Sequence, residues 1–175
     1  MDEDDELRAR LEALYAAHAP EVLVYARRRT DHATAADVLS DVFVVAWQRL
    51  EEVPKDALPW LLGCARHALL NHQRADRRRS RLAARLTANA PSTSFSLEAH
   101  EHRLVQALAR LKERDREVLL LTAWEGLTTR QAARVLGCSP QAFKVRAHRA
   151  RKRLADALLV VDSPPTPLKM EACND

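Results

Sequence analysis

Glycine and aromatic residues are scarce in this sequence. Three of the 175 residues are glycine, and aromatic residues make up 5% of the chain. Alanine, leucine and arginine are abundant instead, and all three are strong helix formers. No segment alternates apolar and polar residues over the length of a half-buried strand. These absences argue against a β-sheet, and the composition predicts an all-α protein.

Long apolar runs and paired cysteines are also missing. No stretch of about eighteen apolar residues occurs, so we expect no membrane span. The first six residues carry five acids, unlike the basic start of a secretory signal peptide. The three cysteines, Cys64, Cys138 and Cys173, have no metal-ligand spacing, and an odd number is typical of a reducing compartment. We therefore expect a cytoplasmic protein without a metal or other cofactor.

Positive charge is concentrated in two short segments. The chain has 28 lysines and arginines against 24 acidic residues, which is a modest excess. Residues 66–85 carry seven arginines and one acid, and residues 140–154 carry six basic residues and no acid. Clustered positive charge is the electrostatic footprint of polyanion binding. For either segment taken alone, a solvated helix face is the alternative interpretation.

The apolar pattern predicts two small helical domains joined by a short linker. We expect the first domain over residues 1–85 and the second over residues 97–160. Residues 86–96 are small and polar and contain a proline, which is typical of a linker that lets two domains move relative to each other. The Pro-rich residues 161–175 predict a disordered tail.

Three helices sharing one apolar seam account for the first domain. The first covers roughly residues 6–29, and we expect an interruption at Pro20 because proline disrupts a helix interior. The second begins near Thr34. The third begins near Trp60, with Pro59 suited to its first turn. We expect Trp47 and Trp60 to be core residues and not platforms on which bases stack. The same expectation is strongest for Trp124 in the second domain.

Local signals in the second domain predict a helix-turn-helix unit. Thr128 and Gln131 have the spacing of a capping box, which opens a short helix. Gly137 then provides a sharp turn. Ser139 is suited to cap a second helix, with Pro140 at its first position. A short helix, a glycine turn and a second helix form the pattern by which many proteins place a helix in DNA.

The second of these helices has one apolar side and one basic side. Small and apolar residues recur at steps of four, three and four, so they share a face. They are Phe143, Ala147, Ala150 and Leu154. The rest of the helix is rich in lysine, arginine and histidine. A helix of this kind fits the major groove, where Arg and Lys bond base edges. We therefore predict DNA binding; an ordinary surface helix is the alternative.

Four stretches together resemble the extracytoplasmic-function (ECF, group IV) class of RNA polymerase sigma factors. They are AADVLSDVFVVAWQRL at residues 35–50, LPWLLGCARHALLNHQRADRRR at 58–79, RLKERDREVLLL at 110–121 and AARVLGCSPQAFKVRAHRARKRL at 132–154. The first two resemble sigma region 2, and the last two resemble sigma region 4. The resemblance implies a factor that binds core RNA polymerase, directs promoter-specific transcription initiation and is controlled by an anti-sigma factor.

The resemblance also implies roles for individual residues in both halves. Contacts to core polymerase are implied for Asp37, Asp41, Phe43, Trp47 and Gln48. Contacts to the promoter's minus-ten element are implied for Arg66, His67, Asn71, Arg74, Arg77, Arg78 and Arg79, with the loop 51–59 beside them. Contacts to the minus-thirty-five element are implied for Lys144, Val145, Arg146, His148, Arg149 and Arg151. Within this last group, Arg146 and Arg151 are expected on phosphates.

Two other classes of protein are alternatives. One is a stand-alone helix-turn-helix repressor or activator, which would bind duplex DNA tightly without polymerase. The other is a metalloenzyme built on His67, His72, His100 and His102. His67 and His72 lie about 140° apart around a helix, which is a poor chelating geometry. The chain has no phosphate-binding glycine loop and no HExxH motif, so we do not expect an enzyme.

Overall fold

The computed structural model describes residues 3–83 and 99–162, and these two ranges contain helices and short turns but no strand. The all-α prediction is therefore confirmed. The helices are α1 (Glu3–Arg27), α2 (His32–Gln48), the 3-10 turn η1 (Leu50–Glu52), α3 (Leu58–Ala83), α4 (Ala99–Arg110), α5 (Glu113–Ala123), α6 (Thr129–Val135) and α7 (Pro140–Asp162). The expected linker at 86–96 lies outside the described residues. Of the tail expected to be disordered at 161–175, Val161 and Asp162 belong to helix α7, so that prediction is wrong for these two residues, and the rest lies outside the described residues.

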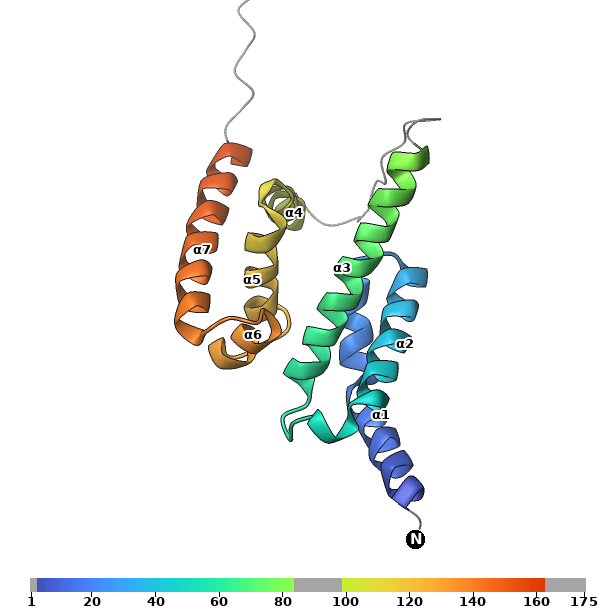
Figure 1. The fold of residues 1–175 in the computed structure, drawn as a ribbon. Coiled ribbons are helices and arrows are strands. Elements are labelled where there is room, and N and C mark those ends of the chain that lie inside the picture. Colours follow the sequence, from blue (N-terminus) through green and yellow to red (C-terminus); the bar gives the residue numbers. More distant parts are fainter. Residues whose placement is uncertain (1–2, 84–98, 163–175) are drawn as a thin grey trace, which may run out of the picture.

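Helices α1, α2 and α3 pack together as the first half of the molecule (Figure 1). Val22, Val38 and Leu61, one from each helix, are fully buried between them. Asp31 fixes the start of α2, since its carboxylate accepts a hydrogen bond from the backbone N–H of Thr34 at 3.0 Å. Hydrogen bonds from the backbone and side chain of Thr34, with smaller contributions from the Asp31 backbone and the Thr30 hydroxyl, hold the pKa of Asp31 down at about 2. This helix start is therefore capped by an ionised carboxylate.

Pro20 does not interrupt the first helix, so that prediction is wrong. Helix α1 is continuous through Pro20. Proline removes the hydrogen bond to the carbonyl four residues earlier, which here belongs to Ala16. Both Pro20 and Ala16 are exposed. Water can therefore reach the carbonyl of Ala16, while Val22 and Tyr25 on the buried side keep the helix packed against its neighbours.

The second half consists of α4 to α7, and its helix-turn-helix unit forms as the local signals predict. The Thr128 side chain accepts from the backbone N–H of Gln131, and the Gln131 side chain accepts from the backbone N–H of Thr128. Gly137 has a φ of 61°, a left-handed conformation that favours glycine. The Ser139 hydroxyl accepts from the backbone N–H of Ala142 at 3.1 Å, so α7 begins with a side-chain cap.

The two halves pack against each other along α3 and α6 (Figure 1). Gly63 of α3 faces α6, and a Cβ at this position would make an ordinary van der Waals contact with the Val135 backbone at 4.0 Å. Most of the buried apolar residues of both halves belong to one continuous cluster. Helix α7 lies on the side of the second half that faces away from α3 (Figure 1). The second half is therefore packed against the first on its α3 side, and its α7 side faces away from the first half.

Two glycine-to-alanine substitutions should change stability in opposite directions. Gly137→Ala forces a Cβ into the left-handed region, so we expect the free energy of unfolding to fall by about 1–2 kcal/mol. Gly63→Ala, in the middle of α3, meets only ordinary contacts and gains helix propensity, so stability should rise by up to about 1 kcal/mol. Urea denaturation of both variants measures the difference. A Gly137→Ala variant as stable as Gly63→Ala would contradict the conformational assignment.

Candidate nucleic-acid interface

The basic side of α7 is open to solvent over its whole length. Phe143, Ala147 and Ala150 are buried against the rest of the second half. All six residues with implied minus-thirty-five roles are exposed, namely Lys144, Val145, Arg146, His148, Arg149 and Arg151. Their side chains are therefore available to an external partner, and the caps at the start of α7 fix the direction in which the helix presents them.

Helical geometry divides these residues into a centre and two flanks. At about 100° per residue, Val145, Arg149 and Lys152 point directly away from the buried stripe. Arg146 lies on one flank of this row, and Arg151 lies on the other. A helix inserted in the major groove turns its central row to the bases and its flanks to the phosphates. Lys152 is exposed and belongs to the central row, so it joins the candidate site.

Arg153 belongs to the framework of the second half, although it lies in the same basic segment. Its Nη1 lies 2.6 Å from a carboxylate oxygen of Asp115 on α5. Asp115 is buried, at 8% exposure. A buried carboxylate needs a charged partner. The pair therefore fixes α7 against α5 and sets the orientation of the basic face.

A second basic surface follows one side of α3. Five of the six described residues with implied minus-ten roles are exposed: His67, Asn71, Arg74, Arg77 and Arg78. With Arg66 they span an arc of about 140° around the helix axis. A guanidinium nitrogen of Arg74 donates to the side-chain oxygen of Asn71 at 3.4 Å. Arg79 lies in α3, but its side chain is outside the described residues.

The second half of the molecule contacts one end of this α3 surface and the loop before it. Arg66 is half-buried, unlike the other described members of the group. Arg77 lies 4.0 Å from Glu113 of α5. In the loop before α3, Asp56 accepts a hydrogen bond from Gln131 at 3.3 Å and lies 3.6 Å from Arg134. Gln131 and Arg134 belong to α6. The loop that is implied to face the minus-ten element therefore contacts α6.

The exposed side of α2 carries a mixed polar and apolar stripe. Asp37, Asp41 and Gln48 are exposed, and Trp47 is 48% exposed. Core burial of Trp47 is therefore not observed. Phe43 is buried at 8% exposure and forms an edge-on contact with Tyr15, with ring centroids 4.7 Å apart. The structure thus brings four of the five implied polymerase contacts to the surface and places Phe43 beneath it.

Apolar residues next to this stripe were not identified from the sequence as site residues. Val44 is 54% exposed between Asp41 and Gln48, and Tyr15 of α1 is 49% exposed. Leu11, Tyr15 and Phe43 line a shallow depression between α1 and α2. Val44 lies within a run of apolar residues, so the sequence alone gave no sign that its side chain is exposed. Asp41 also carries a contact, since His72 of α3 lies 3.0 Å from its carboxylate.

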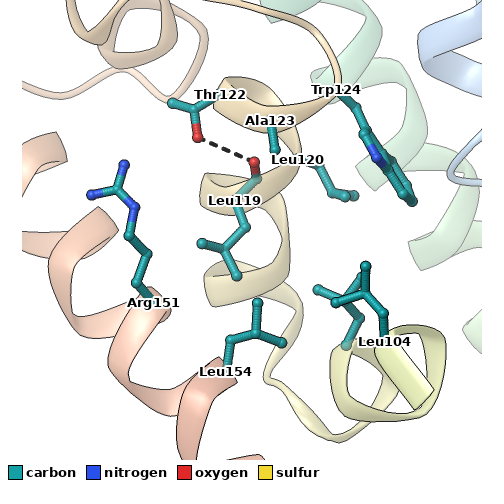
Figure 2. Close-up of a pocket in the computed structure, with 9 residues that line it drawn as sticks. Leu104, Leu119, Leu120, Thr122, Ala123, Trp124, Arg151 and Leu154 are labelled. Atoms are coloured by element: carbon teal, nitrogen blue, oxygen red, sulfur yellow. Dashed lines mark hydrogen bonds between the residues drawn. The ribbon is translucent and has the colours of Figure 1, made fainter. Parts of the chain in front are cut away.

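An apolar groove lies on the second half, between α4, α5 and α7 (Figure 2). Its walls are formed by Leu104, Leu119, Leu120, Trp124 and Leu154, with Arg151 at its edge. The Thr122 hydroxyl donates to the carbonyl of Leu119 at 3.1 Å, which satisfies it within α5. Trp124 is 49% exposed beside this groove, so its expected place in the core is wrong. The guanidinium of Arg28 lies over its ring, 5.6 Å from the centroid.

The described residues contain no group of three side chains able to hold a metal ion. His67 is exposed and His72 pairs with Asp41, while the side chains of His100 and His102 lie outside the description. Burial raises the pKa of the Cys64 thiol to about 11, so it stays protonated at neutral pH. Within residues 3–83 and 99–162, no helix combines the length and apolar character that a membrane span requires.

Comparison with known proteins relates both halves to one family. Residues 14–79 match the model for sigma-70 region 2, and residues 101–154 match the model for sigma-70 region 4. The chain is 33% identical to ECF RNA polymerase sigma factor SigL of Mycobacterium tuberculosis over 154 residues, which cover 83% of this chain and 87% of SigL.

Two solved structures resemble the fold. CnrH, in complex with the cytosolic domain of CnrY, is 31% identical with a TM-score of 0.60, and the match covers 87% of this chain and 89% of CnrH. RpoE, in complex with the anti-sigma factor NepR from Bartonella quintana, has a TM-score of 0.64 at 24% identity, covering 87% and 98%. The second likeness concerns the fold alone. The two matched regions, in this order and with these relatives, show that the chain belongs to the ECF class of sigma-70 RNA polymerase sigma factors.

Proposed function

We propose that the two halves of this sigma factor divide the work of promoter recognition at the boundaries 1–85 and 97–160. The first domain binds core polymerase through α2 and the minus-ten element through α3. The second binds the minus-thirty-five element through α7. The observation that carries this proposal is the exposed basic face of α7, which begins with a cap and has no acidic residue over 140–154, together with a second basic face on α3.

The α7 face would read duplex DNA in the major groove. Arg149 is the candidate for hydrogen bonds to base edges, and Lys144, Val145 and His148 lie beside it. Arg146 and Arg151, on the flanks, would bind phosphates. Lys152 extends the central row by one turn. Arg153 takes no part, because Asp115 holds it against α5.

The α3 face would hold the non-template strand of the opened minus-ten element. Binding of single-stranded DNA needs cations along the backbone and surfaces against which bases stack. Arg66, Arg74, Arg77, Arg78 and Arg79 would supply the cations, with His67 and Asn71 between them. The free energy that opens the duplex would come from binding, so the protein itself would catalyse no reaction.

The exposed stripe of α2 would bind core polymerase. Asp37, Asp41 and Gln48 would supply polar contacts, and Trp47 would supply apolar area. Phe43 would act from below by supporting Trp47 and Tyr15. A large aromatic side chain surrounded by polar residues is the usual composition of an interface hot spot.

An anti-sigma factor would control this activity in the cytoplasm. Both solved relatives described above were determined with a bound protein partner, named as an anti-sigma factor for RpoE. The apolar groove beside Trp124 and the α2 stripe are two exposed surfaces with apolar side chains that would suit such a partner.

Run-off transcription tests the proposed function directly. Core polymerase with this protein should start transcripts at discrete sites on genomic fragments, and core polymerase alone should not. A stand-alone repressor or activator would instead bind duplex fragments without polymerase and yield no transcript in this assay. Absence of any specific start site, with a folded protein and active core enzyme, would overturn the proposal.

Arg149→Ala should weaken binding to the minus-thirty-five duplex by about 1–3 kcal/mol and relax preference at one base pair, because a base-edge hydrogen bond is lost. Arg146→Ala is the matched control on the same helix. It should weaken binding equally for all sequences and reduce the slope of log K against log salt by about 1. Fluorescence anisotropy at several salt concentrations measures both. Equal behaviour of the two variants would contradict the division into centre and flank.

Trp47→Ala should weaken binding to core polymerase by about 2 kcal/mol, roughly thirtyfold in Kd, because an exposed aromatic anchor is removed. Val24→Ala is the control, since it shortens an apolar side chain of similar exposure, 42%, that is not among the proposed polymerase contacts. The Kd of this control variant should change by less than about twofold. Biolayer interferometry with immobilised core enzyme measures both, and an unchanged Kd for Trp47→Ala removes α2 from the interface.

A further inference from the structure

Asp41, on the exposed stripe of α2, receives a hydrogen bond from a different helix. The imidazole Nε2 atom of His72, on α3, lies 3.0 Å from the Oδ2 atom of Asp41. An ionised carboxylate offers only acceptors, so the Nε2–H group of His72 is the donor. The contact therefore joins two residues that are 31 positions apart in the chain, across the packed helices α2 and α3.

Helix α2 itself gives Asp41 no cationic neighbour. Its residues His32–Gln48 include no lysine and no arginine. One helical turn from Asp41, on either side, lie Asp37 and three valines. The valine side chains donate no hydrogen bond, and the negative charge of Asp37 repels that of Asp41. The orientation of the Asp41 carboxylate therefore depends on His72 of the neighbouring helix.

The difference in exposure between the two partners suits a supporting role for the histidine. The side chain of His72 is 28% exposed, whereas that of Asp41 is 56% exposed. The imidazole is therefore restrained by its surroundings, while the carboxylate stays open to an external protein. The contact uses Oδ2, and the two oxygens of a carboxylate together offer about four acceptor positions. Asp41 can therefore keep its bond to His72 and still accept hydrogen bonds from a partner.

His72 lies at the border between the two proposed interfaces of the first domain. On α3, the neighbouring Asn71 and the nearby Arg74 are exposed and belong to the proposed minus-ten surface. On α2, Asp41 belongs to the proposed polymerase surface. A side chain of the helix proposed to bind DNA thus supports a residue proposed to bind polymerase.

We propose that His72 is a positioning residue for core polymerase, because its hydrogen bond fixes the Asp41 carboxylate in its binding orientation before polymerase arrives. This inference rests on the proposed role of α2. A side chain that is already ordered in the free protein loses less conformational entropy when it enters an interface. The group that meets Asp41 on polymerase would be a cationic hydrogen-bond donor, as a guanidinium is. Loss of His72 therefore weakens binding without removing a direct contact.

Two substitutions of His72 separate the hydrogen bond from the bulk of the side chain. His72→Leu removes the donor and keeps a side chain of similar size, so the Kd for core polymerase should rise about threefold to tenfold. His72→Gln supplies an N–H donor at a similar reach, so its Kd should lie within about twofold of the parent value. His32→Leu is the matched control, because His32 is an exposed histidine whose ring contacts Arg27 of α1. The Kd of this control should equal that of the parent.

A double-mutant cycle tests whether His72 acts through Asp41. Asp41→Ala alone should weaken binding, because it removes a proposed direct contact. Adding His72→Leu to Asp41→Ala should change the Kd by less than about twofold, since the hydrogen bond is already absent. Urea denaturation of the same four proteins provides the comparison, because a purely structural pair would show its coupling in stability and not in polymerase binding. A pair with this much solvent exposure contributes little to stability, so we expect the coupling in binding.

Biolayer interferometry with immobilised core enzyme measures each Kd on the full chain, after circular dichroism has established that every variant is folded. An unchanged Kd for His72→Leu would overturn the inference. Tighter binding would overturn it as well, because His72 would then mask Asp41. A loss of equal size in the Asp41→Ala background, or a loss that His72→Gln does not restore, would contradict action through the hydrogen bond. If the parent protein itself does not bind core polymerase, the proposed function of α2 fails instead, so the two failures are distinguishable.

Discussion

Helix α3 is the constraint on which the rest of the structure depends, because three sets of partners share its surface. Leu61, Ala65 and Leu69 are buried in the common core. The small side of the helix at Gly63 accepts α6 at van der Waals distance. Only the remaining part of the helix circumference can carry the basic residues. This exposed part becomes wider toward the end of the helix, where α3 leaves the core. The placement of the second half and the reach of the minus-ten surface are thus two consequences of one helix.

Arginine has two separate tasks in this chain, and burial of the partner distinguishes them. Arg29 and Arg153 bind carboxylates with little solvent access, so they fix helices that would otherwise leave charges unpaired in a low-dielectric interior. Arg146, Arg149 and Arg151 are exposed on α7 and available to a polyanion. The sequence alone does not distinguish these two groups of arginines, because each residue contributes one positive charge. A sigma factor with so thin a core therefore uses part of its positive charge as framework and the rest for DNA.

Much of the fold and part of the site could be predicted because their signals are local. Capping boxes, glycine turns and apolar spacing are decided within about four residues, so the helix-turn-helix unit around Gly137 formed as expected. The exposed face of α7 followed from the same periodicity. The boundaries 1–85 and 97–160 and the residue roles stay predictions, although the region 2 and region 4 matches agree with the order of the halves.

The sequence by itself determined the helical class, the caps and which side of each helix is apolar, since these depend on neighbours within a turn or two. Only the tertiary structure decided which apolar residues stay at the surface, such as Trp124 and Val44, and which aromatic lies beneath another, as Phe43 does beside Tyr15. It also decided that Arg29 meets Glu117 and Glu125. The reason is that these contacts join residues far apart in the chain, whose approach depends on how whole helices pack and leaves no periodic trace in the sequence.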